Sequence, residues 1–526
     1  MARPLPQLAS FLLASLLAYT GLATADQGRP GRISLGSLHA PALAGNSTQQ
    51  ERLHAARVNE AALWRALVAT RLAALQGAAG RVAAPPGDDL ALLRARVAAI
   101  LQGTRARVAV HIRELGHHAA LFDHDGDARL NPASNHKLVT AIASAELLGA
   151  DYRFETRVER DEDTLYLIGE GDPSLQLRHL HALAAEVVAR GEHHGVTRIV
   201  VDDSAFSPDH VGPGYHADAD ASYEAPSGAL SLAFNTVEVT VTPGRHGEPA
   251  AVAITPPSAH VVVDGVVRTG KGRALTVTSA RDGDRTRIHV DGALRGGHAP
   301  VVERRRIADP GLFTGGAFAA VLAELAGEGP LPVERGLASP LATPVAAHTS
   351  APLASVLASA LKYSNNFTTE QVLRTLGWRA SGRPGAWEDG SAAIAELWAA
   401  IGNDPADLVF ENGSGLSSRG RVSARGLVRL LELTGRDGSP AALLLAAFAG
   451  PGGEGTLRLR MPRARDRVRG KTGTIGGVSA LSGVVASRAG DRRIAFSILM
   501  NGREDPRQSR RIQDQVVLAL VDHLDR

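Results

Sequence analysis

The feature that most limits how this chain can fold is a change of pattern near residue 150, where a long β-rich segment begins. Strand patterns at 154–158 and 236–290 surround a single helical pattern at 177–190, and helical periodicity resumes at 312–325. We therefore expect residues 151–335 to form a β-rich module. The pattern leaves open whether that module is itself subdivided.

Two Asp-Gly dipeptides mark turns that we expect to close β-hairpins. Asp264-Gly265 lies between two runs of valine, a pattern typical of a hairpin. Asp125-Gly126 lies in an acidic stretch that resembles a calcium loop, but no glutamate follows at the spacing of an EF-hand. A hairpin turn is therefore the better interpretation at both places.

The segments on either side of the module are mainly helical. A chain of 526 residues is long enough for two or three domains. We expect further helices at 51–76, 89–102, 353–362, 368–376, 391–401 and 425–433, and strands at 107–112, 198–201, 478–486 and 493–500. Apolar residues from Ile512 to Leu524 recur at helical spacing, which predicts a C-terminal amphipathic helix.

The first 25 residues have the pattern of an export signal. Arg3 supplies a positive charge, residues 8–17 form an apolar core, and Ala23-Thr24-Ala25 offers a small-residue cleavage site. The apolar run is short for a spanning helix, although an uncleaved anchor stays open. We expect a periplasmic protein, cleaved near Ala25, with at most peripheral membrane contact.

The charged residues exclude some classes of partner and point to a few lysines. A net charge of +3 is too small to indicate nucleic-acid binding, and the absence of cysteine excludes disulfides and cysteine-ligated metals. Of 57 basic residues, only four are lysines: Lys137, Lys271, Lys362 and Lys471. Arginine stays charged in proteins, so a lysine is needed wherever a cation must lose its proton. We interpret Lys362 as a charge at a helix C-terminus and Lys271 as a turn residue.

Ser134 and Lys137 lie three residues apart at the expected start of a helix. Asn131 is a suitable N-cap, Pro132 suits the first helical position, and Gly149 offers a stop. This spacing places both side chains on one helix face, with Ser134 in the first turn, where free backbone N–H groups favour negative charge. The pair suits a serine nucleophile with a lysine base, but Ser-x-x-Lys alone is weak evidence.

Two further motifs follow Ser134 in order along the chain. Ser364-Asn365-Asn366 comes directly after an expected helix, and Lys471-Thr472-Gly473-Thr474 leads into a pair of expected strands. Ser-x-x-Lys followed by Ser-x-Asn and Lys-Thr-Gly marks β-lactamases and penicillin-binding proteins. The three motifs in this order are much stronger evidence than any one of them.

The chain resembles the D-alanyl-D-alanine carboxypeptidase/endopeptidase family, the class C low-molecular-mass penicillin-binding proteins of the penicillin-binding protein 4 type. The resemblance runs from about residue 90 to 526. It is carried by Pro132–Thr140, Gly171–Leu175, Asp202–Phe206, Gly413–Ser417, Lys471–Thr474 and Gly477–Gly483. One departure is His136, which stands where the family usually has an apolar residue. We expect its side chain to face the surface.

This resemblance implies an α+β fold: a serine β-lactamase/DD-peptidase-like antiparallel sheet flanked by helices, with a β-rich domain inserted between the first two catalytic motifs. The distance from Ser134 to Ser364, 364 − 134 = 230 residues, leaves room for the insertion. The implied divisions are a signal peptide at 1–25, a partly helical N-terminal extension at 26–90, a peptidase domain at 91–150 and 336–526, and the inserted domain at 151–335.

The resemblance also implies catalytic roles for five side chains. Ser134 is expected to attack the carbonyl of a terminal D-alanyl-D-alanine bond, and Lys137 to accept the serine proton once burial and nearby cations lower its pKa. Ser364 would relay a proton to the leaving amine, and Asn366 would orient Lys137 or the substrate amide. Lys471 would attract the substrate carboxylate.

Further residues are implied to bind the substrate. Thr472 and Thr474 offer hydroxyl groups to the carboxylate, and Gly473 lets the strand approach closely. The backbone N–H groups of the nucleophile and of Thr474 would form the oxyanion hole. Asp202 and Phe206 resemble positions that contact the peptide side chain, although strand-end capping and core packing explain them equally well.

The implied partners are peptidoglycan stem peptides and cross-links as substrates, with β-lactam antibiotics as covalent inhibitors. No metal or organic cofactor is expected, and His117, His118 and His124 lack the spacing of a zinc site. A β-lactamase, an esterase and a catalytically silent cell-wall scaffold remain alternatives. The sequence determines neither the balance of carboxypeptidase and endopeptidase activity nor the oligomeric state.

Overall fold

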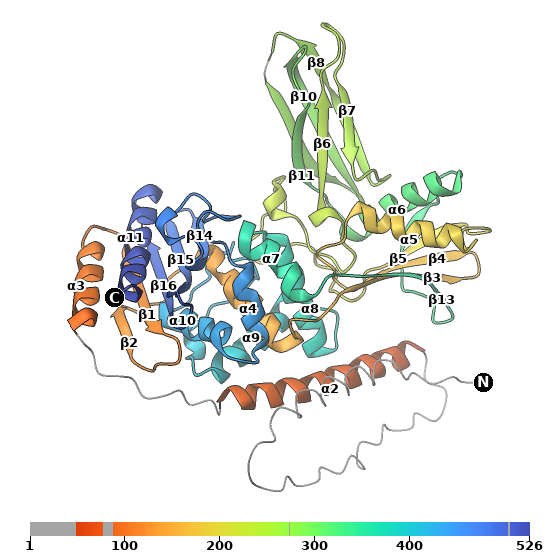
Figure 1. Cartoon of the computed structure of the whole chain (residues 1–526). Helices are drawn as coiled ribbons and strands as arrows, with labels where there is room; N and C mark the ends of the chain where they lie inside the picture. Colours follow the sequence, from red (N-terminus) through yellow and green to blue (C-terminus); the bar gives the residue numbers. More distant parts are fainter. Residues whose placement is uncertain (1–48, 77–87, 273, 503–504) are drawn as a thin grey trace, which may run out of the picture. The chain divides into compact units, whose positions relative to one another are not determined.

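A five-stranded antiparallel sheet brings together strands from distant parts of the chain. The computed structural model describes residues 49–76, 88–272, 274–502 and 505–526, and within it the order of this sheet is β14-β15-β16-β1-β2 (Figure 1). The strands are β1 (Arg107–Glu114), β2 (Ala120–His124), β14 (Val468–Ile475), β15 (Val478–Ala486) and β16 (Arg493–Asn501). Because β1 pairs with β16, the sheet joins residues that lie almost 400 positions apart.

Alternating residues of this sheet belong to two different hydrophobic cores. Val108, Val110 and Ile112 belong to one core together with residues of the helices α3 (Asp88–Leu101) and α11 (Pro506–Leu524). Ala109 belongs to a second core, which also contains residues of several helices from outside the β-rich segment. Successive side chains of a strand point to opposite faces, so the sheet is covered by helices on both sides.

The second core is built from five helices. They are α4 (His136–Leu148), α7 (Leu353–Tyr363), α8 (Asn366–Ser381), α9 (Trp387–Ala400) and α10 (Ala424–Glu432). The N-terminal helix α2 (Gln49–Gln76) contributes Val68 to the same core. This arrangement confirms the expected helix-flanked antiparallel sheet, and α4 and α8 place the first two motifs in one core.

The β-rich segment contains three further sheets, so the module is subdivided. A mixed sheet has the order β12-β5-β4-β3-β13 and packs with the helices α5 (Leu177–Ala189) and α6 (Pro310–Ala326). Two three-stranded sheets, β11-β6-β7 and β8-β10-β9, complete it (Figure 1). The strands are β3 (Glu155–Asp161), β4 (Thr164–Gly169), β5 (Arg198–Asp202), β6 (Thr236–Thr242), β7 (Ala251–Thr255), β8 (Val261–Gly270), β9 (Leu275–Asp282), β10 (Arg285–Arg295), β11 (Val301–Arg306), β12 (Val333–Arg335) and β13 (Thr343–Thr349).

Both hairpins expected at Asp-Gly dipeptides are wrong. Asp264 and Gly265 lie within the continuous strand β8, which pairs in parallel with β10. Gly265 has a φ of +88°, and a Cβ there would lie 2.0 Å from Val290 O, so this glycine permits close contact between strands. Asp125-Gly126 follows β2, whereas the hairpin between β1 and β2 turns at residues 115–119.

The inserted segment extends past the expected boundary at residue 335. Strand β13, Thr343–Thr349, pairs antiparallel with β3 and forms the edge of the mixed sheet. The described residues from Leu53 onward form one compact unit. The inserted strands and the helices of the second core therefore belong to one compact unit.

The expected signal peptide at 1–25 lies outside the described residues. So does most of the expected N-terminal extension at 26–90, of which the structure describes 49–76 and the residues from 88 onward. Within the described part of the chain, no helix combines the length and the apolar character needed to cross a membrane.

Candidate active site

Ser134 lies on a 3-10 turn, Ala133–Asn135, that runs directly into α4. The expected helix start at Asn131 is therefore wrong by several residues. Asn131 instead accepts a hydrogen bond from the Ala133 N–H at 2.7 Å through its side-chain oxygen, and Ala133 has a φ of +46°. This tight turn leaves the Ser134 side chain partly exposed while its neighbours on both sides are buried.

Lys137, on the first turn of α4, reaches back to Ser134 and across to two other segments. Its Nζ lies 3.2 Å from Ser134 Oγ, 2.7 Å from Asn366 Oδ1 and 2.6 Å from the Ser414 carbonyl oxygen. Asn366 also donates from Nδ2 to the Tyr223 carbonyl at 2.9 Å, which fixes the orientation of its amide. The structure thus brings the first two sequence motifs together at one amine.

Burial controls the protonation of Lys137. The residue has no solvent-exposed surface, and this burial lowers the pKa of Lys137 from 10.5 to about 7, while the Glu370 carboxylate opposes the shift. A neutral amine has two N–H donors and one lone pair. Asn366 and the Ser414 carbonyl can accept both N–H groups, which leaves the lone pair for the Ser134 hydroxyl.

Ser364 and Lys471 form a second serine–lysine pair. Ser364 ends α7 with a φ of +64°, and its Oγ accepts a hydrogen bond from Lys471 Nζ at 2.9 Å. Lys471 also donates to the Thr472 carbonyl at 2.7 Å. Burial, and secondarily the charge of Lys137, lowers the pKa of Lys471 well below its usual value. The charge of Lys137 therefore disfavours the charged form of Lys471.

The strand β14 passes close to the nucleophile turn at Gly473. A Cβ on Gly473 would lie 2.4 Å from the Pro132 carbonyl oxygen and 3.2 Å from the Ala133 Cβ, so no larger residue fits without displacing that turn. Thr474 is exposed, and Thr472 donates to the Thr456 hydroxyl at 2.9 Å. Both threonines belong to the strand segment beside Ser134.

The buried carboxylate of Glu370 on α8 fixes the backbone at Gly413 and Ser414. It accepts hydrogen bonds from the Gly413 N–H at 3.1 Å and the Ser414 N–H at 2.8 Å, and from Trp387 Nε1 at 2.8 Å. Tyr215 of the inserted segment donates to the same carboxylate or to Ser414 Oγ, at 3.2 and 3.0 Å. These contacts fix the Ser414 carbonyl that faces Lys137.

Sequence reasoning missed Glu370, Tyr215 and the role of Ser414. The block containing Gly413 and Ser414 carried the family resemblance but had no assigned contact. One signal could have indicated Glu370: it lies in a helix whose residues from Phe367 to Trp378 are buried without interruption. A carboxylate there needs several hydrogen-bond donors. Nothing in the sequence around Tyr215 points to the site.

The expectation that His136 faces the surface is wrong. Its side chain is 1% exposed, its ring lies 5.1 Å from that of Phe410, and its Nε2 has no hydrogen-bond partner. Burial is the main reason that the pKa of His136 is lowered to about 3; a backbone hydrogen bond at Arg421 opposes the shift, and the charges of Lys137 and Arg421 contribute to it. The imidazole is therefore neutral and acts as an apolar packing group, like the residue usual in the family.

Asp202 and Phe206 have capping and packing contacts. Asp202 accepts from the Ser204 N–H at 3.0 Å and from the Ala338 N–H at 2.9 Å. Phe206 is 4% exposed and packs under the guanidinium group of Arg374, 4.6 Å from the ring centre. The structure brings neither side chain into contact with the serine and lysine residues described above.

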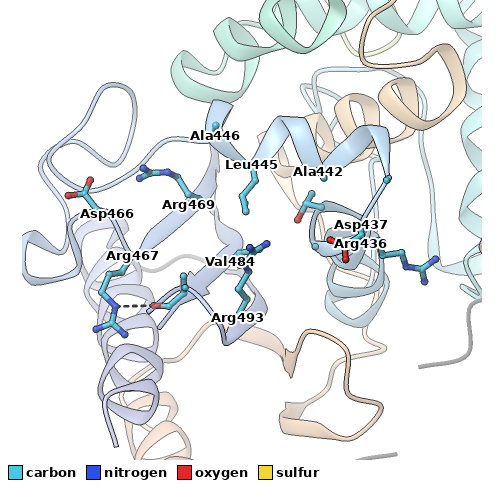
Figure 2. Close-up of a pocket in the computed structure, with 15 residues that line it drawn as sticks. Arg436, Asp437, Ala442, Leu445, Ala446, Asp466, Arg467, Arg469, Val484 and Arg493 are labelled. Atoms are coloured by element: carbon cyan, nitrogen blue, oxygen red, sulfur yellow. Dashed lines mark hydrogen bonds between the residues drawn. The ribbon is translucent and has the colours of Figure 1, made fainter. Parts of the chain in front are cut away.

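A separate cavity of about 630 Å³ lies between η7 (Pro440–Ala447) and the start of β14 (Figure 2). Arg436, Arg467, Arg469 and Arg493 are among its lining residues, and none of the predicted site residues is. Arg467 donates from Nε to the Ala486 carbonyl at 2.9 Å. In Figure 2 the labelled arginines point in different directions rather than toward a common centre, so we assign no ligand to this cavity.

Comparisons with known proteins agree with this geometry. The profile of the D-Ala-D-Ala carboxypeptidase 3 (S13) family matches residues 93–522. A D-alanyl-D-alanine carboxypeptidase of Actinomadura sp. (strain R39) is 34% identical over 484 residues, which cover 85% of this chain and 88% of that protein. Carboxypeptidase DacB of Mycolicibacterium smegmatis is 26% identical over 450 residues, covering 80% and 82% of the two chains.

The fold also matches a solved structure. Penicillin binding protein 4 from Haemophilus influenzae superposes with a TM-score of 0.67 at 21% sequence identity, covering 80% of this chain and 98% of that one. The same protein has been solved in complex with a β-lactam, and that structure matches with a TM-score of 0.64. This similarity confirms the expected α+β penicillin-recognising fold.

Proposed function

Because the chain belongs to the D-Ala-D-Ala carboxypeptidase 3 (S13) family, we propose that Ser134 is the nucleophile of a serine peptidase that acts on peptidoglycan peptides. The observation that carries this proposal is the contact of Ser134 Oγ with Lys137 Nζ at 3.2 Å, in a site where burial lowers the pKa of that lysine to about 7. A general base with a pKa near neutrality is deprotonated in a large fraction of molecules at neutral pH and is still basic enough to accept the serine proton.

In the acylation step, the Ser134 oxygen forms a bond to the carbonyl carbon of the terminal D-alanyl-D-alanine bond. Lys137 accepts the hydroxyl proton, and the C–N bond breaks as the tetrahedral intermediate collapses. The leaving amine needs a proton at that moment. Ser364 gives its hydroxyl proton to the amine and takes a replacement proton from the ammonium group of Lys471, whose Nζ lies 2.9 Å from Ser364 Oγ. Water then hydrolyses the acyl-enzyme and regenerates Ser134.

Charge stabilisation comes from the turn and from β14. The N–H groups of Ser134 and Thr474 form the oxyanion hole, where one donor is typically worth about 3 kcal/mol. Lys471 and the hydroxyl groups of Thr472 and Thr474 bind the substrate carboxylate. A carboxylate at this position favours the ammonium form of Lys471, so substrate binding offsets the cost of charging a buried amine. Asn366 orients Lys137.

The same proposal covers the domain organisation, the partners and the compartment. The peptidase domain comprises 91–150 and the residues after β13, and the inserted domain lies between them. Stem peptides and cross-links are the substrates, and β-lactams acylate Ser134 because their strained amide is held as the peptide bond would be. An exported enzyme, cleaved near Ala25 and active in the periplasm, meets these substrates.

Mass spectrometry after incubation with a penicillin tests the nucleophile. We expect one covalent adduct on the Ser134 peptide, absent in Ser134→Ala and retained in Ser418→Ala, whose side chain is exposed. An adduct at another serine would overturn the assignment, and turnover without accumulation would indicate a β-lactamase. Release of D-alanine from a stem peptide, compared with cleavage of a cross-linked dimer, measures the two peptidase activities.

A further inference from the structure

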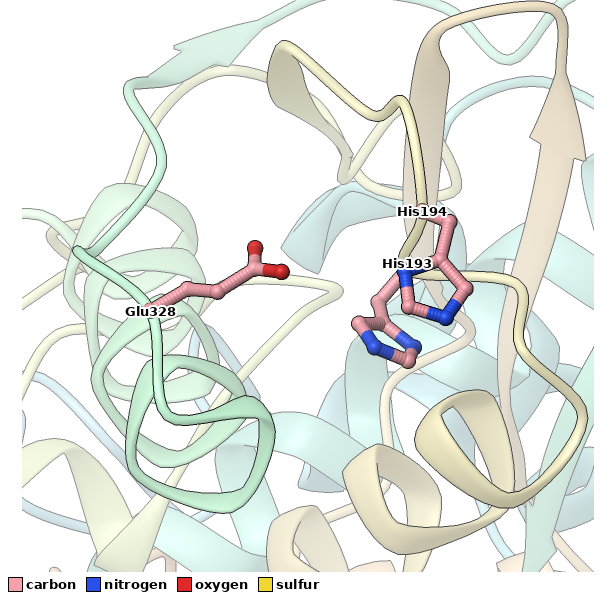
Figure 3. Close-up of side chains that lie close together, drawn as sticks. All are labelled: His193, His194 and Glu328. Carbon is pink, nitrogen blue, oxygen red and sulfur yellow. The ribbon is translucent and has the colours of Figure 1, made fainter.

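Three potential metal ligands converge in the inserted segment, outside the proposed active site. His193, His194 and Glu328 each offer one ligand atom, and these atoms lie within 4.8 Å of one another. Figure 3 shows the Glu328 carboxylate extending from the end of α6 toward the two imidazole rings. The residues come from two segments more than 130 positions apart, so the fold itself creates the cluster.

The backbone that carries the two histidines is held by several hydrogen bonds. The Glu192 N–H donates to the Val187 carbonyl at 3.0 Å, which ties the loop to the end of α5. Arg160 of β3 donates from Nη1 to the Glu192 carbonyl and from Nη2 to the His194 carbonyl, each at 3.0 Å. Its charge is paired with the Glu192 carboxylate at 3.0 Å. The histidine pair is therefore positioned, and the charge of Arg160 is compensated by Glu192.

Glu328 is held at the C-terminus of α6. Gly327 caps the helix with a φ of +69°, and the Glu328 N–H donates to the Ala323 carbonyl at 3.1 Å. Among the described residues, the Glu328 carboxylate has no recorded ion-pair partner. A helix C-terminus carries partial negative charge, which adds to the attraction of this carboxylate for a cation.

An unsatisfied nitrogen gives independent support for a ligand here. His193 Nδ1 is buried and, within the described part of the chain, has no hydrogen-bond partner. Buried polar atoms without a partner are rare in folded proteins, and a bound ion is one of their accepted explanations. A metal ion bound by this imidazole accounts for the unsatisfied nitrogen.

We propose that His193, His194 and Glu328 bind one divalent transition-metal ion, with Zn²⁺ the best fit. Two imidazole nitrogens and one carboxylate are a common zinc donor set, whereas Mg²⁺ and Ca²⁺ prefer oxygen ligands alone. Zinc bonds of about 2.1 Å in a tetrahedron put ligand atoms about 3.4 Å apart. Small side-chain rotations would bring the three ligand atoms from their present spacing to this distance, and a water molecule would occupy the fourth coordination position.

The ion would link the loop after α5 to the end of α6. These helices share one hydrophobic core, so the link would hold the edge of that core in place. None of the three ligands contacts the serine and lysine residues of the proposed active site. The site therefore stabilises the inserted domain and takes no part in peptide hydrolysis. An ion that binds only the folded protein raises its melting temperature in proportion to the logarithm of ion concentration.

Titration of the chelator-treated full chain with ZnCl₂ tests the site. We expect one equivalent to bind by calorimetry, a rise in melting temperature, and a tetrahedral visible spectrum when Co²⁺ replaces Zn²⁺. His193→Ala/His194→Ala and Glu328→Gln should each weaken binding at least tenfold. Glu328 is exposed, so its replacement leaves the fold intact, and circular dichroism checks this.

A second His-His dipeptide, His117-His118, provides the matched control. His117→Ala/His118→Ala should retain the one equivalent, because this dipeptide is not in a three-ligand cluster among the described residues. If this control lost binding as fully as the His193/His194 variant, binding would be adventitious and the proposal overturned. Unchanged binding in His193→Ala/His194→Ala would overturn it as well. Penicillin acylation of Ser134 is measured separately and should be the same in every variant.

Discussion

Lys137 Nζ lies 2.7 Å from Asn366 Oδ1, although the two residues are 229 positions apart. The whole inserted segment lies between them in sequence, and the fold brings Asn366 into contact with the Lys137 amine. The Ser414 carbonyl, 2.6 Å away, occupies a second N–H of the same amine. These two acceptors leave the remaining lone pair of neutral Lys137 directed toward Ser134, which is the orientation that the proposed base needs.

Lys137→Arg should abolish acylation although it keeps the positive charge. A guanidinium group stays protonated in proteins and cannot accept the serine proton. We expect the acylation rate by a penicillin to fall about a hundredfold to ten-thousandfold, since this is what the loss of a general base typically costs. Stopped-flow kinetics measures the rate, and Lys271→Arg, an exposed position, should match the wild type. Retained activity in Lys137→Arg would exclude this lysine as the base.

Asn366→Asp should shift the pH dependence of acylation to higher pH. The rate should rise with pH through about 7 in the wild type, because the active form of Lys137 is the neutral one. A carboxylate 2.7 Å from Nζ favours the ammonium form and raises the pKa of Lys137, typically by about 1 to 3 units. The measurement is kcat/KM between pH 5 and 10.

The maximal kcat/KM that Asn366→Asp reaches at high pH distinguishes a shift in the Lys137 pKa from general damage to the site. A shifted profile with a similar plateau supports control of the Lys137 pKa by its neighbours. A profile that keeps its midpoint near pH 7 while its plateau drops would contradict the assignment. The titrating group would then be another one, and Asn366 would act only on the substrate.

The order of the three sequence motifs predicted that they belong to one site, although it did not predict which side chains touch. Ser364 and Lys471 are 107 positions apart, and their hydrogen bond is known only from the folded chain. His136 was misjudged for a physical reason: its burial is due to Phe410 and Gly420, which approach only in the folded chain. Helical spacing alone does not indicate which neighbouring segment covers a residue.

The strand errors have a similar cause. Asp264-Gly265 has the local chemistry of a hairpin, but pairing with β10 along ten residues outweighs that local preference. Likewise, β13 lies within the stretch 336–526 that was assigned to the peptidase domain, and only its pairing with β3 shows that it belongs to the inserted sheet. Non-local pairing, which no short window of sequence contains, decided both cases.

Gly473→Ala should impair both catalysis and stability. The added Cβ would lie 2.4 Å from the Pro132 carbonyl oxygen, a backbone atom, so the turn carrying Ser134 must move by about 1 Å to reach ordinary contact distance. Displacement of a nucleophile by this amount typically costs about a hundredfold in rate. We expect that reduction in acylation rate together with a lower melting temperature than the wild type.

Gly476→Ala is the matched control for this substitution. Nothing lies within 4 Å of the position of its added Cβ, and Gly476 is only three residues further along the chain. Its acylation rate should equal that of the wild type. Equal loss of activity in both variants would mean that the flexibility of the segment, and not the close approach at Gly473, is what matters.

His136→Met should protect the protein from acid. Burial lowers the pKa of His136 to about 3, whereas its unfolded value is 6.5, so the unfolded state binds the extra proton between these values. Wild-type stability from this group is therefore fully present above pH 6.5 and is lost progressively as the pH falls toward 3. At pH 4 the loss amounts to about 3 kcal/mol. Methionine has no such group and fills a similar volume.

Urea unfolding at pH 7.5 and pH 4 measures this effect. At pH 4, relative to the wild type, the free energy of unfolding of His136→Met should be higher by that amount, while that of His124→Met, at an exposed position, should not. Parallel stability curves for His136→Met and the wild type would contradict a buried neutral imidazole.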